Sequence, residues 1–368
     1  MNWHVIELGM RGTQPKQPSM FTMVSLDAMV PERHPIRAIK PLVDEALREL
    51  SPLFDGMYAK GGRPSIPPER LLKAMLVIAL FSVRSEEQFC EQLRYNMLFR
   101  WFLDMDINEE PFVPTTFTHN RERLLEHEVA PKFFRQVVDQ ARAKGLLSSE
   151  HFSVDGTLIE AWASMKSFRP KDEDSGDNND FGDFKGTKRT NETHESKTDP
   201  EAKLIRKGKG KEAKLAFMGQ ALMENRNGLL IYFLTTEANG HAERDAAVEM
   251  VKRERARRGT AKPRRITVSG DAGYAAREFL KRMRELRATP HVAQGQHAPL
   301  DSRTTRHAGY AVSVRARRLI EKIFGWLKTV GGLRRSRFRG REPTGLYALF
   351  AASAYNLLRM SKLTASAA

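Results

Sequence analysis

The apolar pattern of the chain changes its period after Gly145. Before this point, apolar residues recur at the three- and four-residue spacing of amphipathic helices, as in HPIRAIKPLVDEALREL (residues 34–50). After it, short runs rich in β-branched and aromatic residues come first, and strand and helix patterns then alternate. At roughly 150 residues per domain, 368 residues allow two domains. We therefore predict an irregular segment over residues 1–26 and a helical domain over residues 27–145.

The order of patterns after Gly145 predicts a mixed sheet. HFSVDGTLIEAW (151–162) indicates a strand, and LAFMGQALMEN (215–225) and GLLIYFLTTEA (228–238) indicate two strands joined by a hairpin turn. Helix, strand, helix, strand and helix patterns follow. An antiparallel hairpin joined to parallel strands is typical of a ribonuclease-H-like core. The expected fold class is thus α+β or α/β, with this domain over residues 146–360 and a tail over 361–368.

A polar segment interrupts this domain between residues 166 and 211. It has few apolar residues, and an acidic run is followed by a basic one, RPKDEDSGDNNDFGDFKGTKRTNETHESKTDPEAKLIRKGKGK (169–211). Such a composition cannot bury a core of its own, so we predict a mobile loop here.

The composition favours a polyanionic partner. The formal net charge is +16 and the sequence pI is about 10.0, which points to nucleic acid before an anionic membrane, although charge can also serve solubility alone. Cys90 is the single cysteine, which excludes a disulfide scaffold and a cysteine-based zinc site. The start MNWHVIELGM does not read as a signal peptide, and the run AMLVIALF (74–81) is too short to span a bilayer. We expect a soluble, cytoplasmic protein with no membrane partner.

Three acidic residues stand out in the second half. Asp155 interrupts the first strand pattern, Asp271 follows the strand pattern RITV, and Glu321 lies in the last helix before the basic run. Ligand sites of α/β folds lie beyond the carboxyl ends of strands, where Asp271 is expected. Each acid also has a plain alternative, because both aspartates stand next to glycine in possible turns and Glu321 can pair with Arg317 on the helix surface.

The helical spacing around Glu321 favours a functional role. Residues 315–341 contain ten lysine or arginine residues and this one acid. At about 100° per residue, Arg317 lies about 40° from Glu321 and Lys328 about 20° away on the other side. One carboxylate and two cations thus point to the same place. Carboxylate oxygens suit hard cations such as Mg²⁺, and cations beside them can hold phosphates.

Several other chemistries are excluded by their motifs. KGKGK (207–211) lacks the spacing of a phosphate-binding loop, and no H-E-x-x-H metalloprotease motif occurs. HAERD (241–245) is not followed by Pro-Cys-x-x-Cys, which excludes a zinc deaminase. No serine stands in a G-x-S-x-G nucleophile elbow.

The motifs together resemble a bacterial DDE transposase of the insertion-sequence-5 kind. The resemblance covers about residues 20–360 and is carried by several blocks. These are GRPSIPPERLLKAMLVIALFSVRSEEQFCEQLRYNMLFRWFLDMDI (62–107), TTFTHNRERL (115–124), VDGTLIEAWAS (154–164), DPEAKLIRKGKGKEAKLAFMGQALMENRNGLL (199–230), TTEANGHAERDAA (235–247) and SGDAGY (269–274).

The resemblance implies a site and an activity. Asp155, Asp271 and Glu321 match the acidic triad, which would hold two Mg²⁺ ions, with Mn²⁺ able to substitute. The last block of the family reads Tyr-x2-Arg-x3-Glu-x6-Lys, and Arg317, Glu321 and Lys328 fit it. Val314 stands where the tyrosine is expected, which is a departure. The implied activity is binding of the terminal inverted repeats of an insertion sequence, with metal-dependent DNA cleavage and strand transfer.

The implied partner is double-stranded DNA, both the element ends and the target, bound by a homodimer in the bacterial cytoplasm. The predicted DNA-binding residues are Arg317, Lys328, Arg318, Arg334, Arg335 and Arg337. The weaker candidates, in the helical domain that the resemblance assigns to the inverted repeats, are Arg63, Arg84, Arg94 and Arg121. The basic run 334–341 could instead be a solvated tail. Two other functions stay open, a non-catalytic DNA-binding protein (decayed or domesticated) and a related nuclease without strand transfer.

Overall fold

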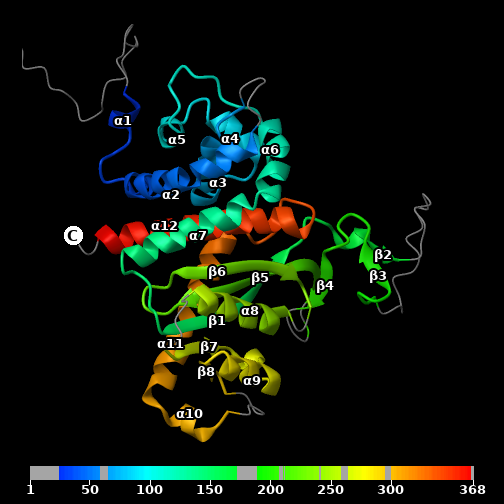
Figure 1. The fold of residues 1–368 in the computed structure, drawn as a ribbon. Helices are drawn as coiled ribbons and strands as arrows, with labels where there is room; N and C mark the ends of the chain where they lie inside the picture. Colours follow the sequence, from blue (N-terminus) through cyan, green and yellow to red (C-terminus); the bar gives the residue numbers. More distant parts are fainter. Residues whose placement is uncertain are drawn as a thin grey trace, which may run out of the picture.

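The computed structural model describes residues 25–58, 65–171, 189–206, 210, 212–239, 242–257, 264–294 and 300–365. Its first part is helical, as predicted (Figure 1). The helices are α1 (Leu26–Met29), α2 (Pro35–Met57), α3 (Pro68–Leu80), α4 (Glu86–Gln92), α5 (Met97–Phe102), α6 (Thr115–Glu126) and α7 (Val129–Ala143). The hydroxyl of Ser85 accepts a hydrogen bond from the Gln88 amide at 3.0 Å and so caps the N-terminus of α4.

The second part contains a mixed sheet with the predicted strands. Its strands are β1 (His151–Glu160), β5 (Ala213–Glu224), β6 (Leu230–Glu237), β7 (Ile266–Gly270) and β8 (Ala288–Val292). With β4 (Lys203–Arg206) they form a six-stranded sheet in the order β4-β5-β1-β7-β8, in which β6 also pairs with β5. β5 is antiparallel to β1, β4 and β6, whereas β7 is parallel to β1 and β8 is parallel to β7. An antiparallel hairpin continued by two parallel strands is the predicted ribonuclease-H-like arrangement, which is confirmed.

Helices cover both faces of this sheet. α8 (Ala242–Arg257) packs on β5, β6 and β1, and α9 (Arg277–Glu285) connects β7 to β8. After the short α10 (Ser302–Arg306), α11 (Ala308–Thr329) packs against β1, β7 and β8. The helix that contains Glu321 therefore begins about four turns before this residue, at Ala308. Among the described residues, no helix is long and apolar enough to cross a membrane.

The polar segment 166–211 contains more structure than the predicted loop. Its described parts form a short hairpin of β2 (Phe168–Pro170) and β3 (His194–Ser196), and β4 (Lys203–Arg206) pairs with the first residues of β5. Phe168 and Leu204 pack with Ile159 and Phe217 in a small second apolar cluster. Anchoring to β5 and to this cluster explains why the sparse apolar residues suffice. The runs 172–188, 207–209 and residue 211 lie outside the described residues.

The last helix joins the two parts. α12 (Arg341–Ala365) packs against α7, α2, α3 and α6 on one side and against β6 on the other, as Figure 1 shows. One apolar cluster extends without a break from α2 through the sheet to α12. The two predicted domains therefore share a core, and much of the segment predicted as a tail is the last turn of α12, where Ser361 is buried.

This shared core predicts a single unfolding transition. The Phe350 ring in α12 is fully buried and lies 5.8 Å from the Phe133 ring in α7. Phe350→Ala is expected to lower the free energy of unfolding by about 3–5 kcal/mol, because it leaves a cavity between the helices and the sheet. Urea unfolding followed by circular dichroism measures this loss. The control Tyr95→Ala removes an exposed ring and should stay within about 0.5 kcal/mol of wild type. Separate transitions for helical and sheet signals would contradict the shared core.

Candidate active site

Two of the predicted acids lie at matching positions of neighbouring parallel strands. Ser153 of β1 is in register with Ser269 of β7, so Asp155, within β1, and Asp271, directly after β7, each come two residues later. β7 ends at Gly270, and the Asp271 carboxylate caps the following 3-10 turn by accepting a hydrogen bond from the Gly273 amide at 2.8 Å. Asp271 thus lies beyond the carboxyl end of its strand, where the sequence placed it.

A shared guanidinium links Glu321 to this pair. Arg317, one turn before Glu321 in α11, donates to Asp155 Oδ2 at 3.3 Å and to Glu321 Oε1 at 3.2 Å. The side chains of Arg317 and Asp155 are only 17% and 16% exposed, whereas that of Glu321 is 60% exposed. The surface pairing of Glu321 with Arg317 exists, but it belongs to a chain of contacts that reaches the first strand. Val314 lies half-buried in the same helix.

A fourth carboxylate, which the sequence analysis did not single out, belongs to this group. Glu243 in the first turn of α8 is half-buried, and its carboxylate approaches Gly156 of β1. Burial raises the pKa of Glu243, and the neighbouring Asp271 carboxylate raises it further. An acid in the first turn of the helix after the hairpin was the available signal.

Each carboxylate of this group makes the ionised form of its neighbours less favourable. Burial raises the pKa of Asp155 to about 6, and the charges of Asp271 and Glu243 act in the same direction. The Gly156 amide, which donates to Asp155 Oδ1 at 2.8 Å, and the Arg317 guanidinium oppose this rise. A site that crowds ionised oxygens in this way favours a bound cation.

The donor chemistry fits Mg²⁺ or Mn²⁺, which prefer carboxylate oxygens. Within the described ranges, however, no three His, Cys, Asp or Glu side chains are already gathered as a metal-ligand set. The Arg317 guanidinium instead stands between Asp155 and Glu321. The site therefore has carboxylate oxygens that suit a hard cation, and the Arg317 guanidinium lies between the carboxylates of Asp155 and Glu321.

The predicted cations of α11 flank this site. Arg318 is exposed next to Arg317, and Lys328 is half-buried near the end of the helix. The basic run after the helix is not a solvated tail. The Glu160 amide donates to the Arg334 carbonyl at 3.1 Å and the Ser336 amide to the Glu160 carbonyl at 2.7 Å, so the run pairs with the end of β1.

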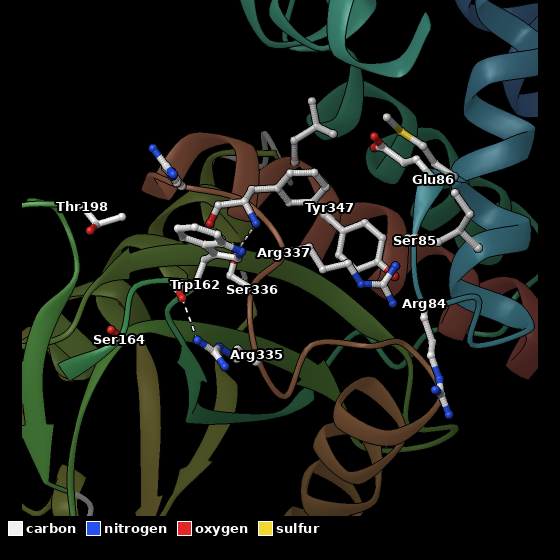
Figure 2. A pocket seen from close by; sticks show the side chains of 15 residues that line it. Arg84, Ser85, Glu86, Trp162, Ser164, Thr198, Arg335, Ser336, Arg337 and Tyr347 are labelled. Carbon is white, nitrogen blue, oxygen red and sulfur yellow. Dashed lines mark hydrogen bonds between the residues drawn. The ribbon is translucent and has the colours of Figure 1, made fainter. Parts of the chain in front are cut away.

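A cavity of about 850 Å³ opens where this run meets the N-terminal helices (Figure 2). Arg335 donates to the carbonyl oxygen of Trp162 at 2.7 Å, and this bond is drawn in Figure 2. Arg339 lies over the Trp162 ring at 4.5 Å, and Arg337 lies over the Tyr347 ring at 5.3 Å. Together with Arg84 at the start of α4, these residues line a cavity that is rich in cations and aromatic rings.

The weaker DNA-binding candidates of the helical part have different surroundings in the structure. Arg84 is exposed and lines the cavity beside the basic run. Arg121 instead pairs with Glu86 at 2.5 Å and covers the Phe338 ring at 4.4 Å, so it has a structural partner. Arg94 is exposed away from the cavity lining. Arg63 lies outside the described residues.

Two family patterns match the chain in succession. A pattern described as a transposase domain matches residues 24–123. One described as a transposase DDE domain matches residues 149–357, more than half of the chain. The chain belongs to the DDE transposase family. This confirms the resemblance that the sequence motifs carry.

Solved structures similar to this DDE transposase are also transposases. The piggyBac transposase synaptic complex with hairpin DNA is 7% identical, with 90% of this chain and 76% of that chain covered and a TM-score of 0.42. A pre-cleavage Mos1 transpososome is 12% identical, with 84% and 82% covered and a TM-score of 0.21. A mariner Mos1 paired end complex with Mg is 13% identical, with 84% and 82% covered and a TM-score of 0.20. No curated protein gave a significant match.

Proposed function

We propose that this transposase binds the terminal inverted repeats of an insertion sequence and catalyses metal-dependent DNA cleavage and strand transfer. The observation that carries the proposal is the placement of Asp155, within β1, and Asp271, directly after the parallel strand β7, at matching register, with Glu321 joined to Asp155 through Arg317. These three acids are the proposed catalytic and metal-binding residues. Because two element ends must be brought together before joining, we propose that the chain acts as a homodimer on DNA.

The chemistry requires a polarised phosphodiester and an activated nucleophile. Bound Mg²⁺ or Mn²⁺ would supply both, with Asp155, Asp271 and Glu321 as the oxygen ligands. The residues of the chain hold and orient the substrate. Arg317 and Lys328 place two positive side chains on the helix that presents Glu321, and a DNA phosphate is the anion that such cations would hold beside the acids.

The proposed DNA path continues from this site to the cavity. Arg318 lies beside the acids on α11, and Arg334, Arg335 and Arg337 follow the end of β1 toward Arg84. Cations in such a row bind phosphates without reading sequence, so they would hold either an element end or target DNA.

The decisive experiment uses the full chain and a duplex that carries the ends of its own element. The expected result is cutting at the ends and a joined product with Mg²⁺, and neither product with EDTA. Cutting without joining would establish the related nuclease instead. Binding of the duplex without cutting in Mg²⁺ or Mn²⁺ would establish a non-catalytic DNA-binding protein, and it would overturn the proposed activity.

The arginines that line the cavity lead to a separate prediction about the affinity for DNA. Arg84→Gln with Arg339→Gln should weaken binding to duplexes of any sequence, because two phosphate contacts are lost, and should reduce the slope of log K against log salt by about 1–2. Fluorescence anisotropy at several salt concentrations measures both. The control Arg94→Gln removes one exposed arginine outside the cavity lining. An unchanged slope in the double variant, or an equal change in the control, would place the DNA elsewhere.

A further inference from the structure

The strand position next to Asp155 has no room for a side chain. A Cβ atom built on Gly156 would lie 2.5 Å from Oε1 of Glu243 and 2.8 Å from Oε1 of Gln220. Both side chains therefore converge on the bare backbone of β1, one residue beyond the first predicted metal ligand. Since successive residues of a strand face opposite sides of the sheet, this pair approaches from the side opposite to Asp155, Arg317 and α11.

Gln220 is a buried side chain without a partner. It lies in the middle of β5, directly opposite Gly156, and is 0% exposed. Neither its Oε1 nor its Nε2 has a hydrogen-bond partner among the described residues. A buried amide that leaves both polar atoms without a hydrogen bond is unfavourable, because both atoms have lost their hydrogen bonds to water. Its position beside Glu243 suggests that the pair is arranged for a bound group.

Glu243 is tied to the other acids of the site. Its charge acts on Asp155, and the charge of Asp271 acts on it. The neighbouring Arg244 donates to the Gly273 carbonyl at 3.2 Å, which ties the first turn of α8 to the turn that Asp271 caps. By contrast, the contact of Glu321 with the group passes through Arg317.

We propose that Glu243 is a fourth acidic residue of the site, which holds the divalent cation, or water bound to it, on the α8 side of β1, with the unpaired buried amide of Gln220 beside it. This inference rests on the proposed function for the identity of the cation. The site then has carboxylates from two helices: Glu321 on α11, which is exposed and pairs with Arg317, and Glu243 on α8, which is half-buried.

The test measures Mn²⁺ binding by the full chain without DNA, from the spin-resonance signal of free Mn²⁺. Glu243→Gln is expected to weaken binding at least fivefold. The matched control is Asp245→Asn, which removes the same charge in the same helical turn, where the carboxylate pairs with Arg282 at 2.6 Å on the surface. The control should stay within twofold of wild type. Equal affinities for Glu243→Gln and wild type would overturn the proposal.

Melting temperatures separate this role from a structural one. In EDTA, Glu243→Gln should melt at or above the wild-type temperature, because a repelled half-buried charge is removed, and it should lose most of the rise that Mn²⁺ gives wild type. A lower melting temperature in EDTA with an unchanged rise in Mn²⁺ would show a structural role. If the glutamine variant does not fold, Glu243→Asp serves instead, with Mn²⁺ binding weakened at least threefold.

The outcome is independent of DNA cutting. If wild type binds Mn²⁺ through Glu243 but cuts no DNA, the fourth acid stands and the proposed activity fails. If wild type cuts DNA and Glu243→Gln binds Mn²⁺ as wild type does, the activity stands and the fourth acid is wrong.

Discussion

Asp155→Asn is expected to abolish DNA cutting and to make the metal-free protein more stable at pH 7. Cutting should fall at least roughly a hundredfold, because a ligand of the proposed cation is lost. Stability should rise because the pKa of Asp155 is raised from 3.8 to about 6, so that ionising this buried carboxyl opposes folding. By linkage, a shift of this size corresponds to roughly 2–3 kcal/mol.

The pH dependence has a defined sign. A raised acid pKa means that the folded chain binds the proton more tightly than the unfolded chain. The contribution of Asp155 to the free energy of unfolding is therefore largest below about pH 4, is lost between about pH 4 and 6, and stays lost above. The difference between wild type and Asp155→Asn, measured by urea unfolding in EDTA from pH 4 to 8, should grow over that window. A variant that is less stable than wild type at pH 7 would contradict this account.

The succession of strands along the chain was predictable because each strand has a local signal. The hairpin turn of residues 225–228, with a left-handed Gly228, and the β-branched run before Asp271 are both visible in single segments. The sharing of one core was not predictable. α12 is apolar on several sides, since it contacts helices and strands, but a sequence pattern does not say which neighbours cover each side.

The candidate site was predictable to the extent that its residues occupy recognisable positions on their own elements. Asp271 follows a strand, and Glu321 shares a helical stripe with Arg317. Contacts between distant elements carry no such signal. The convergence of Glu243 and Gln220 over Gly156 joins three segments. The cavity that Arg84 and Arg339 both line is formed by two segments more than 250 residues apart. These depend on packing that no local spacing encodes.

Arg317→Gln is expected to slow DNA cutting at least roughly a hundredfold, a loss of the size seen when a charged contact that acts in the transition state is removed. Arg317 is the side chain that contacts both Asp155 and Glu321. Its loss would remove the link between the two acids and a cation for the scissile phosphate. The control Arg318→Gln removes an exposed arginine next to it and should reduce cutting much less. Cutting rates at saturating Mg²⁺ and DNA distinguish this loss from weaker DNA binding.

The same substitution should lower the free energy of unfolding in one background and leave it almost unchanged in another. With Asp155 present, Arg317→Gln leaves a buried carboxylate beside Asp271 and Glu243 without its guanidinium, and the free energy of unfolding should fall by about 1–3 kcal/mol. In Asp155→Asn, no charge is left there to compensate, and the loss should largely disappear. The Arg317–Glu321 pair adds little to either value, because Glu321 is exposed. A double-mutant cycle in EDTA measures this coupling, and additive effects would show that the two side chains do not interact.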